Sequence, residues 1–188
     1  MVFLIGTCLA FVLYFVYDVN SVRLQNRLLH SFFALGTLLL VASTIGCLIT
    51  QWNLCLMRRR PVFALGLLPA IAGFILMIRA LFFSIPFIET YLYPRQKPPV
   101  YDRGMYALCR HPGVLWLCLM YFGLSVSWGT ALCACLSAAA GLLDILYVVF
   151  QDCWTFPRAF SNYREYQKSM PFLIPTPKSI QRAWRTRK

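Results

Sequence analysis

The stretch that decides the fold runs from residue 113 to residue 150 and reads GVLWLCLMYFGLSVSWGTALCACLSAAAGLLDILYVVF. It holds two apolar runs, 113–128 and 131–150, with only Gly129 and Thr130 between them. Each run comes close to the roughly 20 residues that a helix needs to cross a bilayer. Because so short a connection forces the two helices to run antiparallel, the sequence predicts a membrane-embedded helical hairpin.

Three further apolar runs of similar length precede the hairpin, at about 2–17, 30–52 and 61–88. Together the five runs predict an all-α, polytopic integral membrane protein with five transmembrane helices. The composition agrees, because 60% of the 188 residues are hydrophobic and only 13% are charged, whereas about a quarter of the residues of a soluble domain are charged. A disordered chain and an ordinary soluble globule are therefore both excluded.

Small residues at helical spacing predict where the helices approach one another closely. In the last run these are Ala131, Cys135 and Ala139, which are four residues apart. In the third run Gly66, Ala70 and Gly73 serve the same purpose. We expect close helix contact along both stripes.

The 18 Lys and Arg residues give a net charge of +12 and gather in the polar gaps between the apolar runs. On a soluble domain this charge would suggest nucleic-acid binding, but here its placement indicates membrane orientation, and we expect no nucleic-acid partner. If the five runs cross alternately, most of the cations share one side, while residues 58–60 lie on the other. Cytosolic loops are enriched in Lys and Arg, so the sequence predicts a cytosolic carboxyl tail. The cations on that side are Arg23, Arg27, Arg95, Lys97, Arg103, Arg110, Arg158, Arg164, Lys168, Lys178, Arg182, Arg185, Arg187 and Lys188.

The sequence predicts neither a metal site nor a disulfide framework. Its eight cysteines are scattered, several within apolar runs, where free Cys behaves as a small hydrophobe. Cys133 and Cys135 are two residues apart in a predicted helix and so face different sides. With only two histidines, His30 and His111, the chain offers no metal-ligating cluster.

Two ionisable residues, Arg79 and Asp144, fall inside apolar runs. An unpaired charge in hydrocarbon costs at least ~2.5 kcal/mol, so each residue needs a partner or water. Either Arg79 reaches lipid phosphate with its long side chain while Asp144 makes a polar contact, or both line a polar cavity. The sequence leaves these two interpretations open.

A polar, proline-rich segment at 89–112 joins the third and fourth runs. Its prolines hold the chain extended, so we expect a rigid loop on the cytosolic face. The loop brings Tyr106, Arg110 and His111 to the membrane surface just before Pro112 begins the next helix. Proline suits a first helical turn and leaves the neighbouring N–H groups free for a carboxylate or phosphate.

Beyond the hairpin, Asp152 leads into a second polar segment in which Thr155 is expected to cap a helix that begins at Phe156. Phe156, Phe160 and Tyr163 are spaced by four and three residues, which predicts a cytosolic amphipathic helix lying in the interface. The alternative is a basic tail that only binds anionic lipid.

Residues 104–113, GMYALCRHPG, resemble the G-x-Y-x-x-x-R-H-P-x signature of the isoprenylcysteine carboxyl methyltransferase family and its phospholipid methyltransferase relatives. Residues 160–175 are similar to that family's F-G-x-x-Y-x-x-Y-x-x-x-V-P ending, with Tyr163 and Tyr166 at its two tyrosines. A weaker resemblance covers residues 78–80, IRA, which are similar to an arginine-containing helix before the signature. Together these matches cover roughly residues 70–177, in the family's order.

The resemblance implies a membrane methyltransferase that uses S-adenosylmethionine on a lipophilic or small membrane-accessible acceptor. An isoprenylcysteine carboxylate, a phospholipid amine and a thiol all suit this description. It also implies three regions: N-terminal transmembrane helices at 1–60, a methyltransferase-like core with a cytosolic cofactor pocket at 61–177, and a basic tail at 178–188. The residues expected to bind the cofactor are Tyr106, Arg110, His111, Asp152, Tyr163 and Tyr166, and those expected in catalysis are Arg110, Arg79 and Asp144.

The chain departs from the family's pattern at Val114, Trp116 and Ser161, and Cys153 stands where the family has a second acid. The first alternative is therefore an inactive family member that serves as a membrane interaction subunit. The second is a small transporter in which Arg79 and Asp144 contact the substrate. Because the chain is so compact, a bacterial inner membrane is favoured over the endoplasmic reticulum, and the oligomeric state is left open.

Overall fold

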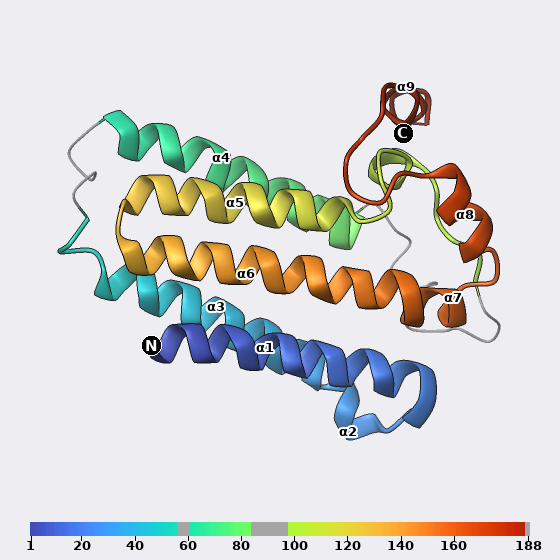
Figure 1. The fold of residues 1–188 in the computed structure, drawn as a ribbon, viewed down its shortest axis with the longest axis horizontal. Helices are drawn as coiled ribbons and strands as arrows, with labels where there is room; N and C mark the ends of the chain where they lie inside the picture. The colour runs from blue at the N-terminus through green and yellow to red at the C-terminus, as the bar shows by residue number, and fades with distance from the viewer. Residues whose placement is uncertain (56–60, 84–97, 187–188) are drawn as a thin grey trace.

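The computed structural model describes residues 1–55, 61–83 and 98–186, and every regular element in these ranges is helical. Figure 1 shows the long helices side by side in one bundle. They are α1 (Val2–Val19), α3 (Phe32–Thr50), α4 (Pro61–Ile78), α5 (Pro112–Trp128) and α6 (Ala131–Phe150). The short helices are α2 (Arg27–His30), α7 (Phe156–Ala159), α8 (Tyr163–Ser169) and α9 (Pro177–Arg185).

Four helical segments are long and apolar enough to cross a membrane: Val2–Leu24, Arg27–Thr50, Pro61–Leu81 and Ala131–Ala159. Helix α5 is a shorter apolar helix of 17 residues. Many large apolar side chains on the long helices are exposed, as expected where hydrocarbon replaces water around the bundle. The described residues thus confirm an all-α protein with membrane-spanning helices, while the count of five spans stays a prediction.

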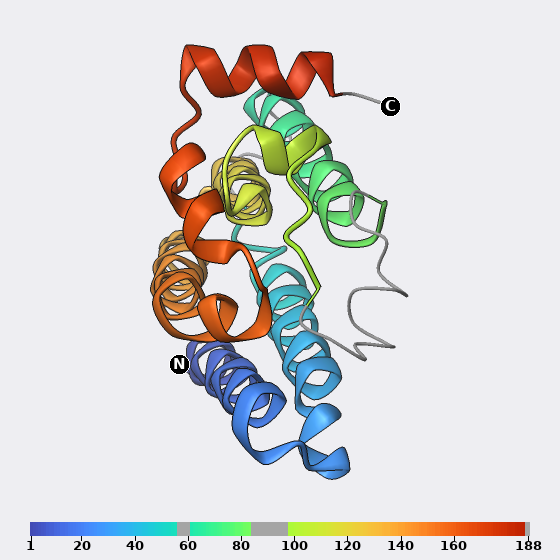
Figure 2. The ribbon, with the colours of Figure 1, turned by 90° about the vertical axis from the view of Figure 1, so that its right-hand side faces the viewer.

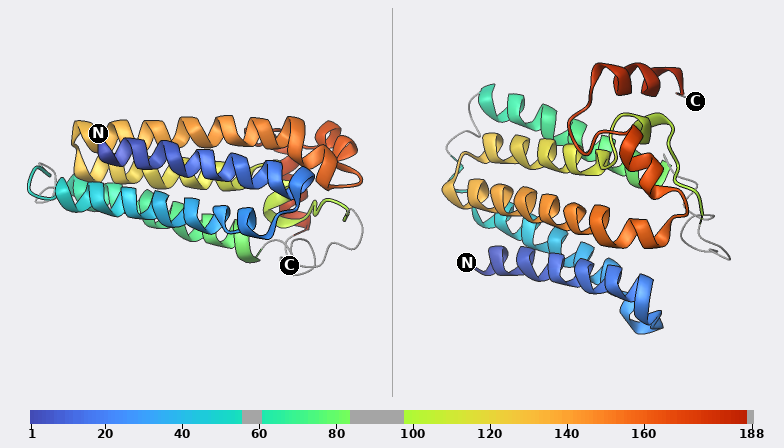
Figure 3. Two further views of the ribbon diagram at one scale, coloured as in Figure 1. Left: turned by 90° about the horizontal axis from the view of Figure 1, so that it is seen from below. Right: turned by 45° about the vertical axis from the view of Figure 1, so that its right-hand side comes forward.

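The helices pack in the order α4, α5, α6, α1 and α3, each against the next. Figure 2 looks along the bundle and shows this arrangement, with α3 close to α1. The two views of Figure 3 show that α2, α7, α8 and α9 gather at one end of the bundle. We call it the Asp152 end, because α6 ends there just before Asp152.

The predicted hairpin is present. Gly129 closes α5 in the left-handed conformation, with a φ of 62° that favours glycine. Thr130 then caps α6, because its side chain accepts a hydrogen bond from the backbone N–H of Cys133. Two residues are therefore enough to reverse the chain.

Close packing occurs where the glycines of α4 predict it. Gly66 and Gly73 are buried against α5, and a Cβ at Gly73 would lie 2.5 Å from the backbone nitrogen of Met120. The contact expected along Ala131 and Cys135 is wrong, because both residues are exposed. Residue spacing shows that small side chains share one face of a helix but not whether that face is turned toward the protein. The buried face of α6 instead carries Cys133, Leu136, Ala140 and Val148.

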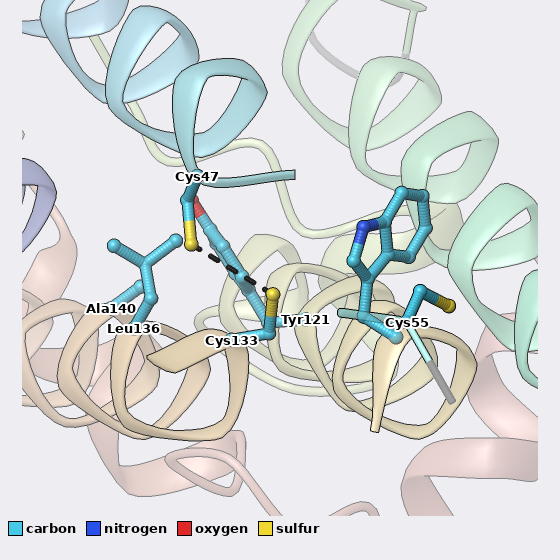
Figure 4. Close-up of a cluster of buried hydrophobic side chains, with 7 residues drawn as sticks. Cys47, Cys55, Tyr121, Cys133, Leu136 and Ala140 are labelled. Carbon is cyan, nitrogen blue, oxygen red and sulfur yellow. Dashed lines mark hydrogen bonds between the residues drawn. The ribbon is translucent and has the colours of Figure 1, made fainter. Parts of the chain in front are cut away.

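The core far from the Asp152 end joins α3 to the hairpin (Figure 4). The buried sulfur atoms of Cys47 and Cys133 lie 3.8 Å apart as free thiols. The hydroxyls of Thr44 and Tyr121 are 2.7 Å apart, and the indole N–H of Trp128 donates to the carbonyl of Leu48 at 2.9 Å. The last two bonds connect α3 with α5, and the two cysteines lie between α3 and α6.

Replacing Gly123 with Ala tests the α4–α5 contact. A Cβ at Gly123 would meet backbone atoms of Gly66 and Ala70, which cannot move aside as a flexible side chain can. We expect a loss of about 1–3 kcal/mol of stability, measured by thermal unfolding in detergent. Gly141→Ala is the matched control, since its Cβ meets only the Cys118 sulfur at 3.5 Å. Equal stability of the two variants would contradict the packing.

Candidate functional site

The candidate site is built around the carboxylate of Asp152. Helix α6 widens into a π-helical turn at Gln151–Thr155, which carries Asp152. The guanidinium of Arg110 pairs with this carboxylate through two nitrogens, Nε at 3.0 Å from Oδ1 and Nη2 at 3.1 Å from Oδ2. The side chains of Arg110 and Asp152 are only 12% and 9% exposed, so the ion pair is largely removed from solvent.

Three more side chains donate to Asp152. The hydroxyl of Tyr163 lies 2.6 Å from Oδ1, Nε2 of His111 lies 3.1 Å from Oδ1, and Nε2 of Gln167 lies 3.0 Å from Oδ2. We call these five residues the Asp152 cluster. They come from the loop before α5, the turn after α6 and helix α8, so the cluster joins the loop, 42 positions earlier in the chain, to two neighbouring segments that follow α6.

Backbone bonds hold Arg110 in this position. Its N–H donates to the carbonyl of Pro171 at 2.9 Å, and its Nη1 donates to the carbonyl of Gln167 at 2.8 Å. Directly after His111, Pro112 is the first residue of α5, as predicted. Helix α8 and the segment directly after it therefore fix both the backbone and the side chain of the arginine.

Aromatic rings enclose the cluster. The imidazole of His111 stacks on Phe156 at 5.8 Å and meets the edge of Phe172 at 5.1 Å. The guanidinium of Arg110 lies 5.5 Å from the centre of the Phe172 ring. On the other side, Phe156 also meets Tyr163 edge-on at 5.4 Å. These rings exclude water and so strengthen the polar contacts inside.

Two expectations for the segment after α6 are wrong. Thr155 does not cap a helix, because its hydroxyl instead donates to Oδ2 of Asp18 at 3.2 Å. The continuous amphipathic helix is interrupted at Phe160, whose backbone is extended between α7 and α8. Phe156 and Phe160, which are partly buried, pack against the buried ring of Tyr163. Helical spacing of aromatic residues does not distinguish a lipid-facing stripe from a core.

Tyr106 and Tyr166 lie beside the cluster and brace the loop that carries Arg110. The Tyr166 hydroxyl donates to the carbonyl of Tyr106 at 2.7 Å. The Tyr106 hydroxyl donates to the carbonyl of Ala80 at 3.3 Å. Arg79, which precedes Ala80, is exposed at the start of the turn Arg79–Phe83 that follows α4.

Asp144 lies outside the cluster. It occupies the interior of α6, eight residues before Asp152, which is about 12 Å along a helix axis. Of the predicted site residues, the structure thus joins Arg110, His111, Asp152 and Tyr163 directly and places Tyr106 and Tyr166 next to them.

Sequence reasoning missed Gln167 and Phe172. Gln167 donates to both the carboxylate and the backbone carbonyl of Asp152. It is four residues after Tyr163, so the helical repeat places the two side chains on one face of α8 and would have indicated it. Phe172 lies in an irregular segment, and no periodicity points to it.

Burial favours the neutral forms of His111, Tyr163 and the neighbouring Tyr166. Burial is the main factor that lowers the pKa of His111, against the opposing effect of Asp152. Because an ionised carboxylate only accepts, Nε2 of neutral His111 is the donor. Burial, followed by the bond to Asp152, raises the pKa of Tyr163, and burial raises the pKa of Tyr166. Burial also raises the pKa of the nearby Cys109 thiol to about 11.

A cavity of about 190 Å³ adjoins the cluster and is lined by Tyr163 together with Pro157, Phe160, Ser161, Asn162, Arg164 and Glu165. Small-molecule pockets usually measure about 300–1,000 Å³. The Asp152 cluster is therefore a closed polar centre with a small opening beside it.

Substituting Asp152 with Asn tests the central ion pair. The change leaves the Arg110 charge buried without its partner, which costs about 3–5 kcal/mol. Asp102→Asn is the control, since its ion pair with Arg182 is 41–44% exposed and contributes at most about 1 kcal/mol. Chemical unfolding in detergent measures both. Similar losses in the two variants would contradict the assignment of Asp152 as the centre.

Neutral His111 makes stability depend on pH. The unfolded chain binds a proton at a histidine pKa near 6.5, whereas folded His111 binds it only at lower pH. Below about pH 6.5 the unfolded state therefore holds more protons, and the stability present above this pH is lost as pH falls. Unfolding curves at several pH values measure this effect. As pH falls below about 6.5, the free energy of unfolding should decrease less for His111→Gln than for the unchanged protein. Identical pH dependence would contradict the prediction.

The chain matches no protein-family model, no curated protein and no solved structure. The resemblance to methyltransferases therefore depends on the two motif segments and the weaker arginine match alone.

Proposed function

We propose that this protein is an integral membrane methyltransferase that uses S-adenosylmethionine to modify a lipophilic or small membrane-accessible acceptor. The observation that carries the proposal is the meeting of its two motif segments at one carboxylate. Arg110 and His111 belong to the first segment, Tyr163 belongs to the second, and all three donate to Asp152. These residues resemble parts of one family's motifs and also meet at one carboxylate, which supports the proposal that they form one binding site.

The proposal includes a topology. We place α5 in the membrane as a fifth span, because it packs between α4 and α6 and is apolar throughout. The Asp152 end, which carries Arg103, Arg158 and Arg164 among its cations, then faces the cytosol by the positive-inside rule. A bacterial inner membrane remains the favoured location.

The donor set at the Asp152 end fits the chemistry of the cofactor. Arg110 has five N–H groups, and three of its nitrogens are engaged within the chain, which leaves two N–H groups for a carboxylate. No side chain caps the start of α5, so its first N–H groups offer a second anion contact. The rings of Tyr163 and Phe172 supply aromatic surface beside these donors. Bound cofactor would contribute an activated methyl group.

Within this proposal each chain residue has a stated task. Asp152 orients Arg110 and His111, since its two oxygens accept from both. Tyr106 and Tyr166 hold the loop in place. Arg79 and Asp144 would orient the polar end of an acceptor, one at the end of α4 and the other within α6. The acceptor class remains an isoprenylcysteine carboxylate, a phospholipid amine or a thiol.

One observation favours a second candidate, an inactive relative that serves as a membrane interaction subunit. Both oxygens of Asp152 are already fully used by donors of the chain. Cys153 stands where the resembled family has its second acid, and it is exposed. In this candidate the cluster fastens the segment after α6 and binds no cofactor.

Thermal unfolding of the detergent-purified chain with S-adenosylmethionine or S-adenosylhomocysteine tests the proposal. A ligand at about 100 times its Kd adds about 2.7 kcal/mol, which for a chain of this size raises the Tm by roughly 5–10 °C. The shift should vanish in Arg110→Ala and persist in Arg103→Ala, which removes an exposed arginine of the same loop. Absence of any shift with either nucleotide would favour the interaction subunit.

A further inference from the structure

Helix α9 lies beside one end of the bundle and runs roughly perpendicular to the long helices. Figure 1 shows α9 almost end-on while the long helices run across the view, and Figure 2 shows the reverse. If the long helices cross a membrane, α9 therefore lies close to the membrane plane. Its start is well defined. Thr176 precedes the first helical residue, Pro177, and the side chains of Thr176 and Ser179 each accept a hydrogen bond from the backbone N–H of the other.

One face of α9 is docked on the loop before α5. Arg182 pairs with Asp102. The N–H of Gly104 donates to the hydroxyl of Thr186 at 3.2 Å. Ser179 is buried on the same side. These contacts fix the rotation of the helix about its axis.

With this face of α9 against the loop, two other sides of the helix are exposed, one apolar and one basic. Successive helical residues lie about 100° apart, which places Ile180 and Trp184 on one side, 41% and 69% exposed. The same repeat places Lys178 and Arg185 together on the other side, and both are exposed. The sequence from 177 to 188 contains no acidic residue.

We propose that α9 seats on the membrane surface and binds anionic phospholipid headgroups. A bilayer surface offers apolar chains and phosphates side by side, and stable attachment of an in-plane helix uses both contacts. An exposed tryptophan next to basic residues suits the interface, where indole rings and cations accumulate. Helix α9 lies near one end of the long helices, which is where the membrane surface would be if these helices cross the bilayer.

Lipid binding at α9 would also stabilise the loop beneath it. Asp102 and Gly104 lie in the chain just ahead of Arg110, and between Gly104 and Arg110 the backbone carbonyl of Tyr106 accepts from the Tyr166 hydroxyl. A helix held at the surface therefore restrains the segment that leads into the Asp152 cluster. This inference is independent of the proposed methyl transfer and stands or fails separately.

Quenching of Trp184 fluorescence tests the proposal in the full chain. The protein is reconstituted into nanodiscs of phosphatidylcholine with brominated acyl chains, with and without phosphatidylglycerol. Subtracting the signal of Trp184→Phe isolates Trp184 from the other tryptophans. We expect the Trp184 component to be quenched in both discs, about twofold more strongly when anionic lipid is present.

Two double variants separate the charge contribution. Lys178→Gln/Arg185→Gln should lose the extra quenching by anionic lipid while keeping the quenching in phosphatidylcholine. Arg27→Gln/Lys168→Gln removes two exposed cations outside α9 and should behave as the unchanged protein. Equal quenching in the two lipids would overturn the anionic preference. A Trp184 component that only aqueous iodide quenches, or that is shielded by a second copy of the chain, would overturn the membrane contact itself.

Discussion

The structure at the Asp152 end depends on one buried carboxylate and its arginine. Asp152 and Arg110 are 42 positions apart in the sequence, yet both are largely hidden from solvent and joined through two nitrogens. A charge buried in this way is stable only when its partners are complete. Tyr163, His111 and Gln167 complete them. The loop before α5, the turn after α6 and helix α8 are thereby held in a single arrangement.

The sequence predicts the hairpin and the meeting of its flanking segments. The apolar run 131–150 coincides with α6, and Gly129 with Thr130 forms the expected reversal. Arg110, His111, Asp152 and Tyr163 meet as expected, because a hairpin returns the chain to the side where it began. Helix length and chain reversal are local properties that composition and spacing determine.

Contacts that depend on the direction of a side chain escape such reasoning. The stripe at Ala131 and Cys135 faces outward, whereas Cys133 and Leu136 are buried. Phe160 is extended between two short helices although its spacing suits one long helix. For α6 the partner is a distant segment, since Cys133 meets Cys47 of α3, whereas Phe160 keeps its local contacts with Phe156 and Tyr163 through an extended backbone. Gln167 differs from these cases, because it lies one helical turn after Tyr163 and the helical repeat alone would have indicated its position beside Asp152.

The separation of the cluster's members along the chain sets the order in which it is completed during synthesis. Arg110 and His111 leave the ribosome before the hairpin exists, and their anionic partner follows only after α6. Helix α8, with Tyr163 and Gln167, is made later still. Until Asp152, Tyr163 and Gln167 have been made, the contacts that hold the Arg110 side chain in the finished protein cannot form, so the Asp152 cluster is completed only near the end of synthesis.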